Sequence, residues 1–225
     1  MNKKINLYGD NYNVLSIGRG SDISSQRIDD LDRAATAYAA QHEHSGLFLD
    51  LGCGFPVQAA RFALLGKKVI AVDSHDFSPQ FELLRSLFSF IDISFLNKQL
   101  EELDDSDIVR PVSSIFSQRT IHYLHPHKAN RLISWLRGKS EPGCKCFISA
   151  SGMDSELGCN YDGNALEWDN RYCELSASNR KKHGIEGPVC LYRQNDLIDL
   201  MQRNGFKCET IYASEFGNIK GVFVV

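Results

Sequence analysis

Short apolar runs alternate with amphipathic segments over most of the chain, and this pattern predicts strands alternating with helices. The runs typical of buried strands cover residues 47–51, 69–72, 91–96, 112–117, 145–151, 206–212 and 222–225. Apolar residues at helical spacing predict helices over 27–41, 56–65, 78–88, 126–137 and 196–204. This alternation indicates an α/β protein with a mostly parallel sheet and helices on both faces, and 225 residues suit a single domain.

Two segments fall outside the alternation. Residues 1–26 are polar and irregular, with turn residues gathered at 8–12 and 18–22, and we expect loops there. Residues 152–190 are rich in Gly, Asn, Asp, Ser and Tyr and contain a basic run at 180–183. Since a structureless loop of this length is uncommon inside a compact domain, we expect an inserted element with a short helix near 165–176.

The most informative stretch is the first predicted strand and the glycine turn that follows it, Asp50-Leu-Gly-Cys-Gly54. A helix comes next, and the second strand ends on Asp73, 19 residues after Gly54. This spacing is typical of a nucleotide site in which the acid binds ribose. The dinucleotide fingerprint asks for Gly or Ala where Val57 stands. A carboxylate at Asp50 would also repel a pyrophosphate and attract an ammonium group.

S-adenosylmethionine (SAM) carries an ammonium and a sulfonium and no phosphate, and the segment Asp50–Gly54 with Asp73 resembles motifs I and II of class I SAM-dependent methyltransferases. The resemblance covers about residues 45–151 closely and 190–225 loosely. It implies a Rossmann-like seven-stranded sheet with an antiparallel last strand. It also implies a single domain in which residues 1–44 form a lid or cap and 152–190 an insertion on the substrate side.

The residues that the resemblance assigns to the cofactor lie at or just after the ends of predicted strands: Asp50, Gly52, Gly54, Asp73, Ser74, Gln99, Leu100 and Gln118. The first three are expected to meet the methionine end of SAM, and Gln118 to touch the same moiety. Asp73 is expected to hold the ribose hydroxyls, and the remaining three to surround the adenine. Gln99 stands where Asp is commoner, and its amide oxygen can still accept a hydrogen bond.

The catalytic residues are harder to predict, because methyl transfer from a sulfonium depends mainly on positioning the acceptor. A general base is needed only when the acceptor must lose a proton. His122, with an ordinary pKa of about 6.5, is the candidate base, and Tyr123 could orient the acceptor. Both side chains could equally serve as packing at the strand end. The run 180–183 could grip an anionic group of the acceptor or face water.

Charge and motifs narrow the acceptor. The net charge of −3 provides no general basic field for a long nucleic acid. Residues 117–120 lack the proline-containing motif of DNA amino-methyltransferases. We therefore expect a small-molecule or protein acceptor. Three alternatives stay open: an RNA methyltransferase, a non-catalytic SAM-binding module, and an NAD enzyme.

The cysteines and the apolar runs bear on metal content and location. Of seven cysteines only Cys144 and Cys146 lie close together, so no metal site is expected and the thiols are taken as reduced. Reduced thiols and the lack of a secretory signal predict a cytoplasmic protein. No apolar run reaches 18 residues, so no membrane span is expected.

Overall fold

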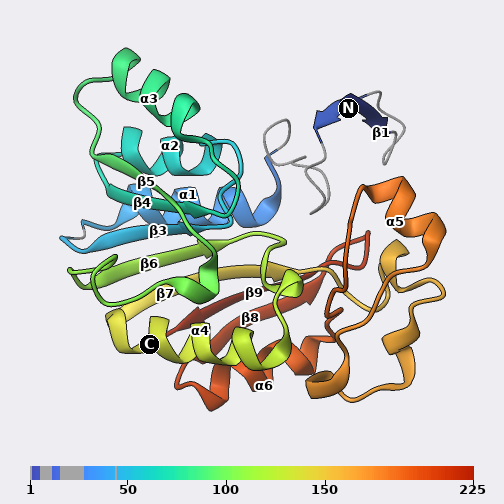
Figure 1. Ribbon diagram of the computed structural model, residues 1–225. Helices are drawn as coiled ribbons and strands as arrows, with labels where there is room; N and C mark the ends of the chain where they lie inside the picture. Colours follow the sequence, from blue (N-terminus) through green and yellow to red (C-terminus); the bar gives the residue numbers. More distant parts are fainter. Residues whose placement is uncertain (1, 6–11, 16–27, 44) are drawn as a thin grey trace.

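The main sheet of the protein has seven strands in the order β5-β4-β3-β6-β7-β9-β8. The computed structural model describes residues 2–5, 12–15, 28–43 and 45–225 (Figure 1). Strands β3 to β7 run parallel, and β9 lies antiparallel to both of its neighbours. The strands are β3 (Leu47–Leu51), β4 (Lys68–Asp73), β5 (Ile93–Asn97), β6 (Val112–Ser117), β7 (Ser140–Ala150), β8 (Lys207–Ala213) and β9 (Ile219–Val224). The predicted seven-stranded sheet with an antiparallel last strand is confirmed.

Helices cover both faces of this sheet, as the sequence pattern predicts (Figure 1). One face carries α1 (Asp30–Gln41), α2 (Val57–Leu64) and α3 (Ser78–Leu87), and the other carries α4 (Pro126–Lys139) and α6 (Gln194–Arg203). Each of these helices lies within a few residues of its predicted bounds. The pattern succeeds because each helix buries one apolar stripe against the sheet.

The central strand β3 divides the core in two. Every residue of β3 is buried, as expected for a parallel strand covered on both sides. Leu47, Leu49 and Leu51 belong to the apolar cluster that contains α4 and α6 residues. Phe48 faces the other way and meets Phe62 of α2 with ring centroids 5.4 Å apart. Since side chains alternate along a strand, Asp50 shares the face of Phe48, beneath α1 and α2.

Two predicted boundaries are wrong. Part of the segment expected to be loop forms a hairpin, in which β1 (Asn2–Ile5) pairs antiparallel with β2 (Tyr12–Leu15). Strand pairing of this kind is made by backbone N–H and C=O groups, so a polar sequence does not exclude it. The other turn residues predicted at 8–11 and 18–22 lie outside the described residues. Strand β7 begins at Ser140 instead of 145, and a register shift opposite β6, between Val112 and Ser114, accommodates the additional residues.

The insertion at 152–190 is an ordered element with its own small apolar core, made by Leu157, Tyr161, Leu175, Ile185, Val189 and Leu191. The short helix predicted near 165–176 is wrong: the α-helix of this segment is α5 (Ala177–His183). The predicted range holds the 3-10 turn Trp168–Asn170 and the last residue of another, Asp162–Ala165. The N-cap explains the shift, because the Ser176 hydroxyl accepts a hydrogen bond from the Asn179 N–H and so starts the helix.

A buried arginine organises the insertion. Arg171 is 0% exposed, and its guanidinium donates to the Leu166 carbonyl oxygen at 3.1 and 3.0 Å and to the Leu191 carbonyl oxygen at 3.1 Å. It also donates to Asp196 Oδ2 of α6 at 2.5 Å. These bonds tie the insertion to the main domain.

In the described part of the chain, no helix is both long and apolar enough to cross a bilayer.

Candidate functional site

The carboxyl ends of four adjacent parallel strands bring the predicted cofactor residues to one edge of the sheet. β3 ends at Leu51, β4 at Asp73, β5 at Asn97 and β6 at Ser117. All eight predicted residues stand at these ends or within three residues of them: Asp50, Gly52, Gly54, Asp73, Ser74, Gln99, Leu100 and Gln118. Ligands of doubly wound sheets bind at this edge, so the structure gathers a plausible site.

The first three N–H groups of the loop after β3 are hydrogen-bonded to the end of β4. The N–H groups of Gly52 and Cys53 both donate to the Val72 carbonyl oxygen, at 2.8 and 3.1 Å. The Gly54 N–H donates to Asp73 Oδ2 at 2.9 Å. A loop that cradles phosphate must point such N–H groups at the anion. Three consecutive donors are already occupied here, one of them by a carboxylate.

Glycine is required in this loop for two separate reasons. Gly52 and Gly54 have φ of +68° and +55°, in the left-handed region that L side chains rarely adopt. A Cβ at Gly52 would also lie 2.2 Å from the Thr120 side chain. The loop after β3 and the segment after β6 therefore approach each other so closely that no side chain fits between them.

Asp73 holds the loop in place as well as facing the site. Its Oδ2 accepts from Gly54 and its Oδ1 accepts from the His75 N–H at 2.9 Å. A carboxylate offers about four lone-pair positions, so two remain after these bonds. Asp73 is half-buried, and the lone pairs that no described residue occupies can accept from hydroxyl donors such as those of a ribose.

A cavity of about 20 Å³ lies between β3, β6 and helices α1 and α2. Its polar lining includes Asp50, Asp32, Gln118, Gln58 and Arg61. Asp50 and Asp32 are each 2% exposed, so two carboxyl groups border a space large enough for one water molecule. Arg61 lines the cavity too and lies 3.7 Å from Asp32, so its charge offsets that carboxyl, and the second carboxyl at Asp50 favours a cationic or hydrogen-bond-donating occupant.

Burial changes the acidity of Asp32. It raises the pKa of Asp32 from 3.8 to about 6, and the nearby Asp29 charge adds to the rise. The Asp29 N–H donates to Asp32 Oδ2 at 2.9 Å, and Arg61 Nη1 lies 3.7 Å from Asp32 Oδ1, and both contacts limit the rise. Asp32 therefore titrates within a range that ordinary buffers reach.

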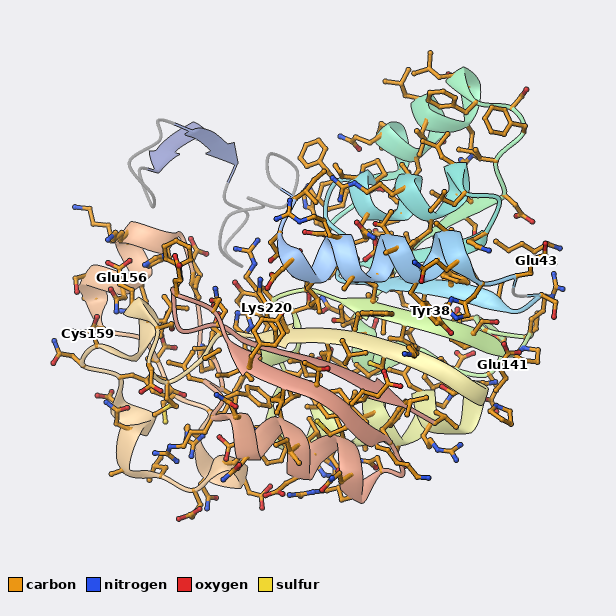
Figure 2. The ribbon with its side chains drawn as sticks, turned by 180° about the vertical axis from the view of Figure 1, so that it is seen from behind. Tyr38, Glu43, Glu141, Glu156, Cys159 and Lys220 are labelled. Carbon is orange, nitrogen blue, oxygen red and sulfur yellow. The ribbon has the colours of Figure 1, made fainter. Side chains whose placement is uncertain are left out.

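The N-terminal end of α1 is fastened to the strand ends through Asp29. Asp29 Oδ1 caps the helix by accepting from the N–H groups of Leu31 and Asp32, at 2.9 and 3.2 Å. Its Oδ2 accepts from Gln118 Nε2 at 2.5 Å and from Lys220 Nζ at 2.7 Å. Figure 2 shows Lys220 beside this end of the helix.

Lys220 and Tyr212 also hold the next residue of the helix. Lys220 Nζ donates to Asp30 Oδ1, and the Tyr212 hydroxyl donates to Asp30 Oδ2 at 2.7 Å. Burial alone would raise the pKa of Asp30, but the hydrogen bonds from Lys220 and Tyr212 and the Lys220 charge outweigh it and lower the pKa. Helix α1 is thus joined to β9 and β8, and whether it acts as a lid stays a prediction.

His122, the candidate base, is 1% exposed and both of its ring nitrogens face Ser151. The Ser151 N–H donates to Nδ1 at 3.3 Å, so Nε2 carries the proton and donates to the Ser151 hydroxyl at 3.3 Å. Burial, together with a smaller contribution from the Arg119 charge, lowers the pKa of His122 to about 3. A general base needs an open nitrogen and a pKa near neutrality, and this buried environment favours neither, so a catalytic role of His122 stays a prediction.

The other predicted residues occupy varied positions. Ser74 directly follows β4, Gln99 caps the 3-10 turn Leu100–Glu102, and Leu100 is buried. Tyr123 is half-buried against the core of the insertion, and its carbonyl oxygen accepts from the Tyr172 hydroxyl at 3.1 Å. Their contacts with adenine or acceptor stay predictions.

The basic run 180–183 lies on α5, and three of its four residues lie next to acidic side chains. Arg180 Nη1 lies 2.9 Å from Glu174 Oε2, and Lys182 bonds Glu156. His183 Nε2 lies 3.3 Å from Glu156 Oε2. An anionic acceptor would have to compete with these carboxylates, and a grip on the acceptor stays a prediction.

Sequence reasoning missed three residues of this site: Asp29, Asp32 and Lys220. The first two had a signal, because Asp-x-x-Asp before an apolar periodic segment is an N-cap pattern related to the capping box. Lys220 had a weaker one, since it interrupts an otherwise apolar final strand and is 6% exposed. Neither signal reveals that the helix start and the last strand meet across 191 positions of sequence.

Neither the protein-family models nor the curated proteins include a match to this sequence. Solved structures do share its fold. A methyltransferase of Clostridium acetobutylicum described as SAM-dependent is similar with a TM-score of 0.66 and 11% identity, over 90% of this chain and 94% of that one. The 1,6-didemethyltoxoflavin-N1-methyltransferase of Burkholderia thailandensis gives a TM-score of 0.63 and 16% identity, over 90% and 80% of the two chains.

A third similar structure is magnesium protoporphyrin IX methyltransferase of Synechocystis, with a TM-score of 0.60 and 14% identity over 86% of this chain and 80% of that one. The Burkholderia and Synechocystis enzymes were crystallised with S-adenosylhomocysteine (SAH). At these identities the likeness establishes the fold. The chain thus has the class I methyltransferase fold, with the strand order and antiparallel β9 described above.

Proposed function

We propose that the protein is a SAM-dependent methyltransferase that acts on a small-molecule or protein acceptor. The observation that carries this proposal is the loop after β3, whose three consecutive N–H groups are bonded internally and whose last N–H is bonded to Asp73. Such a loop offers no free donors for a pyrophosphate, so an NAD enzyme is disfavoured. A carboxylate-lined site suits the cationic methionine end of SAM.

The residues present fit this cofactor at both ends. At the ribose end, Asp73 keeps two unused acceptor positions. At the methionine end, Asp50 and Gln118 border the cavity. The side-chain oxygen of Gln118 is buried and has no hydrogen-bond partner among the described residues. An unsatisfied buried acceptor costs about 1–3 kcal/mol, and a bound ammonium would remove that cost. Ser74, Gln99 and Leu100 are proposed to surround the adenine.

The chemistry asks little of the protein beyond geometry. SAM supplies an electrophilic methyl group, and the acceptor forms its new bond to that carbon as the carbon–sulfur bond breaks and SAH leaves. Holding the two reactants in line can lower the barrier by up to about 7–11 kcal/mol. The described residues contribute by fixing the loop after β3, by neutralising the ammonium, and by holding α1 against the strand ends. In this proposal His122 joins β6 to β7 and takes no proton, while Tyr123 orients the acceptor.

The fold neighbours favour a small acceptor. The Burkholderia enzyme was crystallised with a small heterocycle, 1,6-didemethyltoxoflavin, and the Synechocystis enzyme is named for a porphyrin. The ordered insertion follows β7 in the chain, and we propose that it forms one wall of the acceptor pocket.

The cytoplasmic location is part of this proposal and rests on the seven cysteines, all in the described part of the chain and none of them in a disulfide.

The test separates binding from turnover. Isothermal titration calorimetry with SAH and with NAD should give micromolar binding of SAH and none of NAD, and the reverse result would end the proposal. Asp73→Ala should weaken SAH severely, because the ribose hydroxyls and the Gly54 N–H lose their acceptor together. Transfer of a labelled methyl group from SAM to fractions of a cell extract then tests catalysis. Binding of SAH without transfer to any fraction would favour a non-catalytic SAM-binding module.

A further inference from the structure

The amide of Gln118 has one orientation that its neighbours permit. Asp29 Oδ2 receives a hydrogen bond from Lys220, and its Oδ1 receives two from backbone N–H groups. The neighbouring Asp32 carboxyl, whose pKa Asp29 helps to raise, takes up the proton more readily than usual and leaves Asp29 as the acceptor. A carboxylate in this state only accepts. The Gln118 group that lies 2.5 Å from it must therefore be the NH2 group. The amide oxygen is the atom left for the cavity that Gln118 lines.

That oxygen is buried and has no partner in the described part of the chain. The same cavity is bordered by Asp50 and Asp32, and its volume of about 20 Å³ suits a water molecule or an ammonium group. Three oxygen-bearing side chains thus face a space in which no donor from the described residues satisfies the Gln118 oxygen.

We infer that Asp29 and Lys220 are positioning residues that hold the Gln118 amide with its oxygen toward the cofactor ammonium. The chain of contacts runs from Lys220 of β9 to Asp29 at the start of α1 and on to Gln118 after β6. These contacts decide which end of the Gln118 amide faces the cavity. If the amide were reversed, its two N–H donors would face the cation. This inference rests on the proposed function, because it assumes that the amino-acid end of SAM enters the cavity.

The variant Asp29→Asn tests the polarity without removing the helix cap, since Asn caps helices as well as Asp. Its amide oxygen can keep the two backbone bonds, and its NH2 group then replaces Oδ2 opposite both Gln118 and Lys220. Lys220 keeps Asp30 as its acceptor. Gln118 must turn its own oxygen toward that group and point its NH2 into the cavity. We expect SAH affinity to fall by at least about tenfold, as for a lost hydrogen bond to a charged group.

Asp30→Asn is the matched control. Asp30 is the neighbouring residue, it also bonds Lys220, and its substitution removes the same charge, but it makes no contact with Gln118. We expect this variant to bind SAH within about threefold of the wild type. A general loss of negative charge would weaken both variants equally, whereas a reversed amide weakens Asp29→Asn alone.

The probes are SAH and its deamino analogue, in which hydrogen replaces the amino group, measured by calorimetry on the full chain. Wild type should prefer SAH by at least about tenfold, and Asp29→Asn should lose the preference while binding the analogue unchanged. Equal preference in wild type and Asp29→Asn would overturn the inference and leave the proposed function standing. Binding of neither ligand by the folded wild type would overturn the proposed function itself.

A second variant covers the case in which Asp29→Asn does not fold, as judged by its thermal unfolding. Gln118→Met keeps the side-chain length and removes the amide oxygen. It should also lose the preference for SAH over the deamino analogue. A Gln118→Met protein that keeps the wild-type preference would show that the ammonium is held elsewhere and would overturn the inference.

Discussion

The buried guanidinium of Arg171 allows the most quantitative prediction. In Arg171→Met, the side chain keeps most of its apolar volume and loses four hydrogen bonds, including the one to Asp196. Removing one partner of a buried ion pair costs about 3–5 kcal/mol. Here the Leu166 and Leu191 carbonyl oxygens lose their donor together with Asp196, whose side chain is 15% exposed. Asp196 also accepts from the Arg193 N–H at 2.6 Å and so cannot turn freely to water. For a protein of this size, that loss lowers the melting temperature by roughly 6–20 °C.

The assay is thermal unfolding by circular dichroism, combined with limited proteolysis of the insertion. Arg180→Met is the control, since Arg180 belongs to the same insertion and its contact with Glu174 is exposed. Exposed pairs contribute at most about 1 kcal/mol, so this variant should melt within a few degrees of the wild type. No insertion residue lines the cavity, so folded Arg171→Met should bind SAH normally. An Arg171→Met melting temperature equal to that of Arg180→Met would refute the reasoning.

Three further predictions concern the site. Gly52→Ala should destabilise the fold by at least about 2 kcal/mol and weaken the affinity for SAH. Gly66→Ala has a similar φ of +76° and open space around it, so it should cost only the backbone strain of about 1 kcal/mol. Equal losses of stability in the two variants would contradict the close approach of Thr120. SAH affinity should weaken as pH falls through about 6, because Asp32 then becomes neutral, and Asp32→Asn should flatten this pH profile. The folded state raises the pKa of Asp32 above 3.8, so the unliganded wild type should lose stability as pH rises from 3.8 to about 6. A stability profile with the opposite sign would count against the burial of Asp32. His122→Gln should lower the melting temperature and leave turnover within several-fold of the wild type, and a loss above a hundredfold in a variant with unchanged melting would restore His122 as the base.

Much of the fold could be predicted because its helices and strands follow from the local periodicity of apolar residues. The apolar run at 47–51, the glycine turn and the acid at Asp73 lie close together in sequence, and parallel strands bring their carboxyl ends to one edge. The insertion could not be predicted in the same way. Its order depends on Arg171, whose partners Leu166, Leu191 and Asp196 reach up to 25 residues away, and no periodic pattern marks a buried arginine.

The candidate site shows the same division. The glycine loop and Asp73 follow from spacing, but the environment of His122 does not. A pattern shows a histidine after a strand and reveals neither its contacts with Ser151 nor the burial that lowers its pKa to about 3. Likewise, the link from Asp29 to Lys220 joins residues 191 positions apart, and only the folded sheet brings them together.

A crystal structure of the protein with SAH tests the central claim most directly. We expect the ribose hydroxyls on Asp73, and the ammonium at the cavity bordered by Asp50 and the Gln118 oxygen. A ligand bound away from the carboxyl ends of β3 and β4, or an ammonium held by residues outside this cavity, would contradict the account.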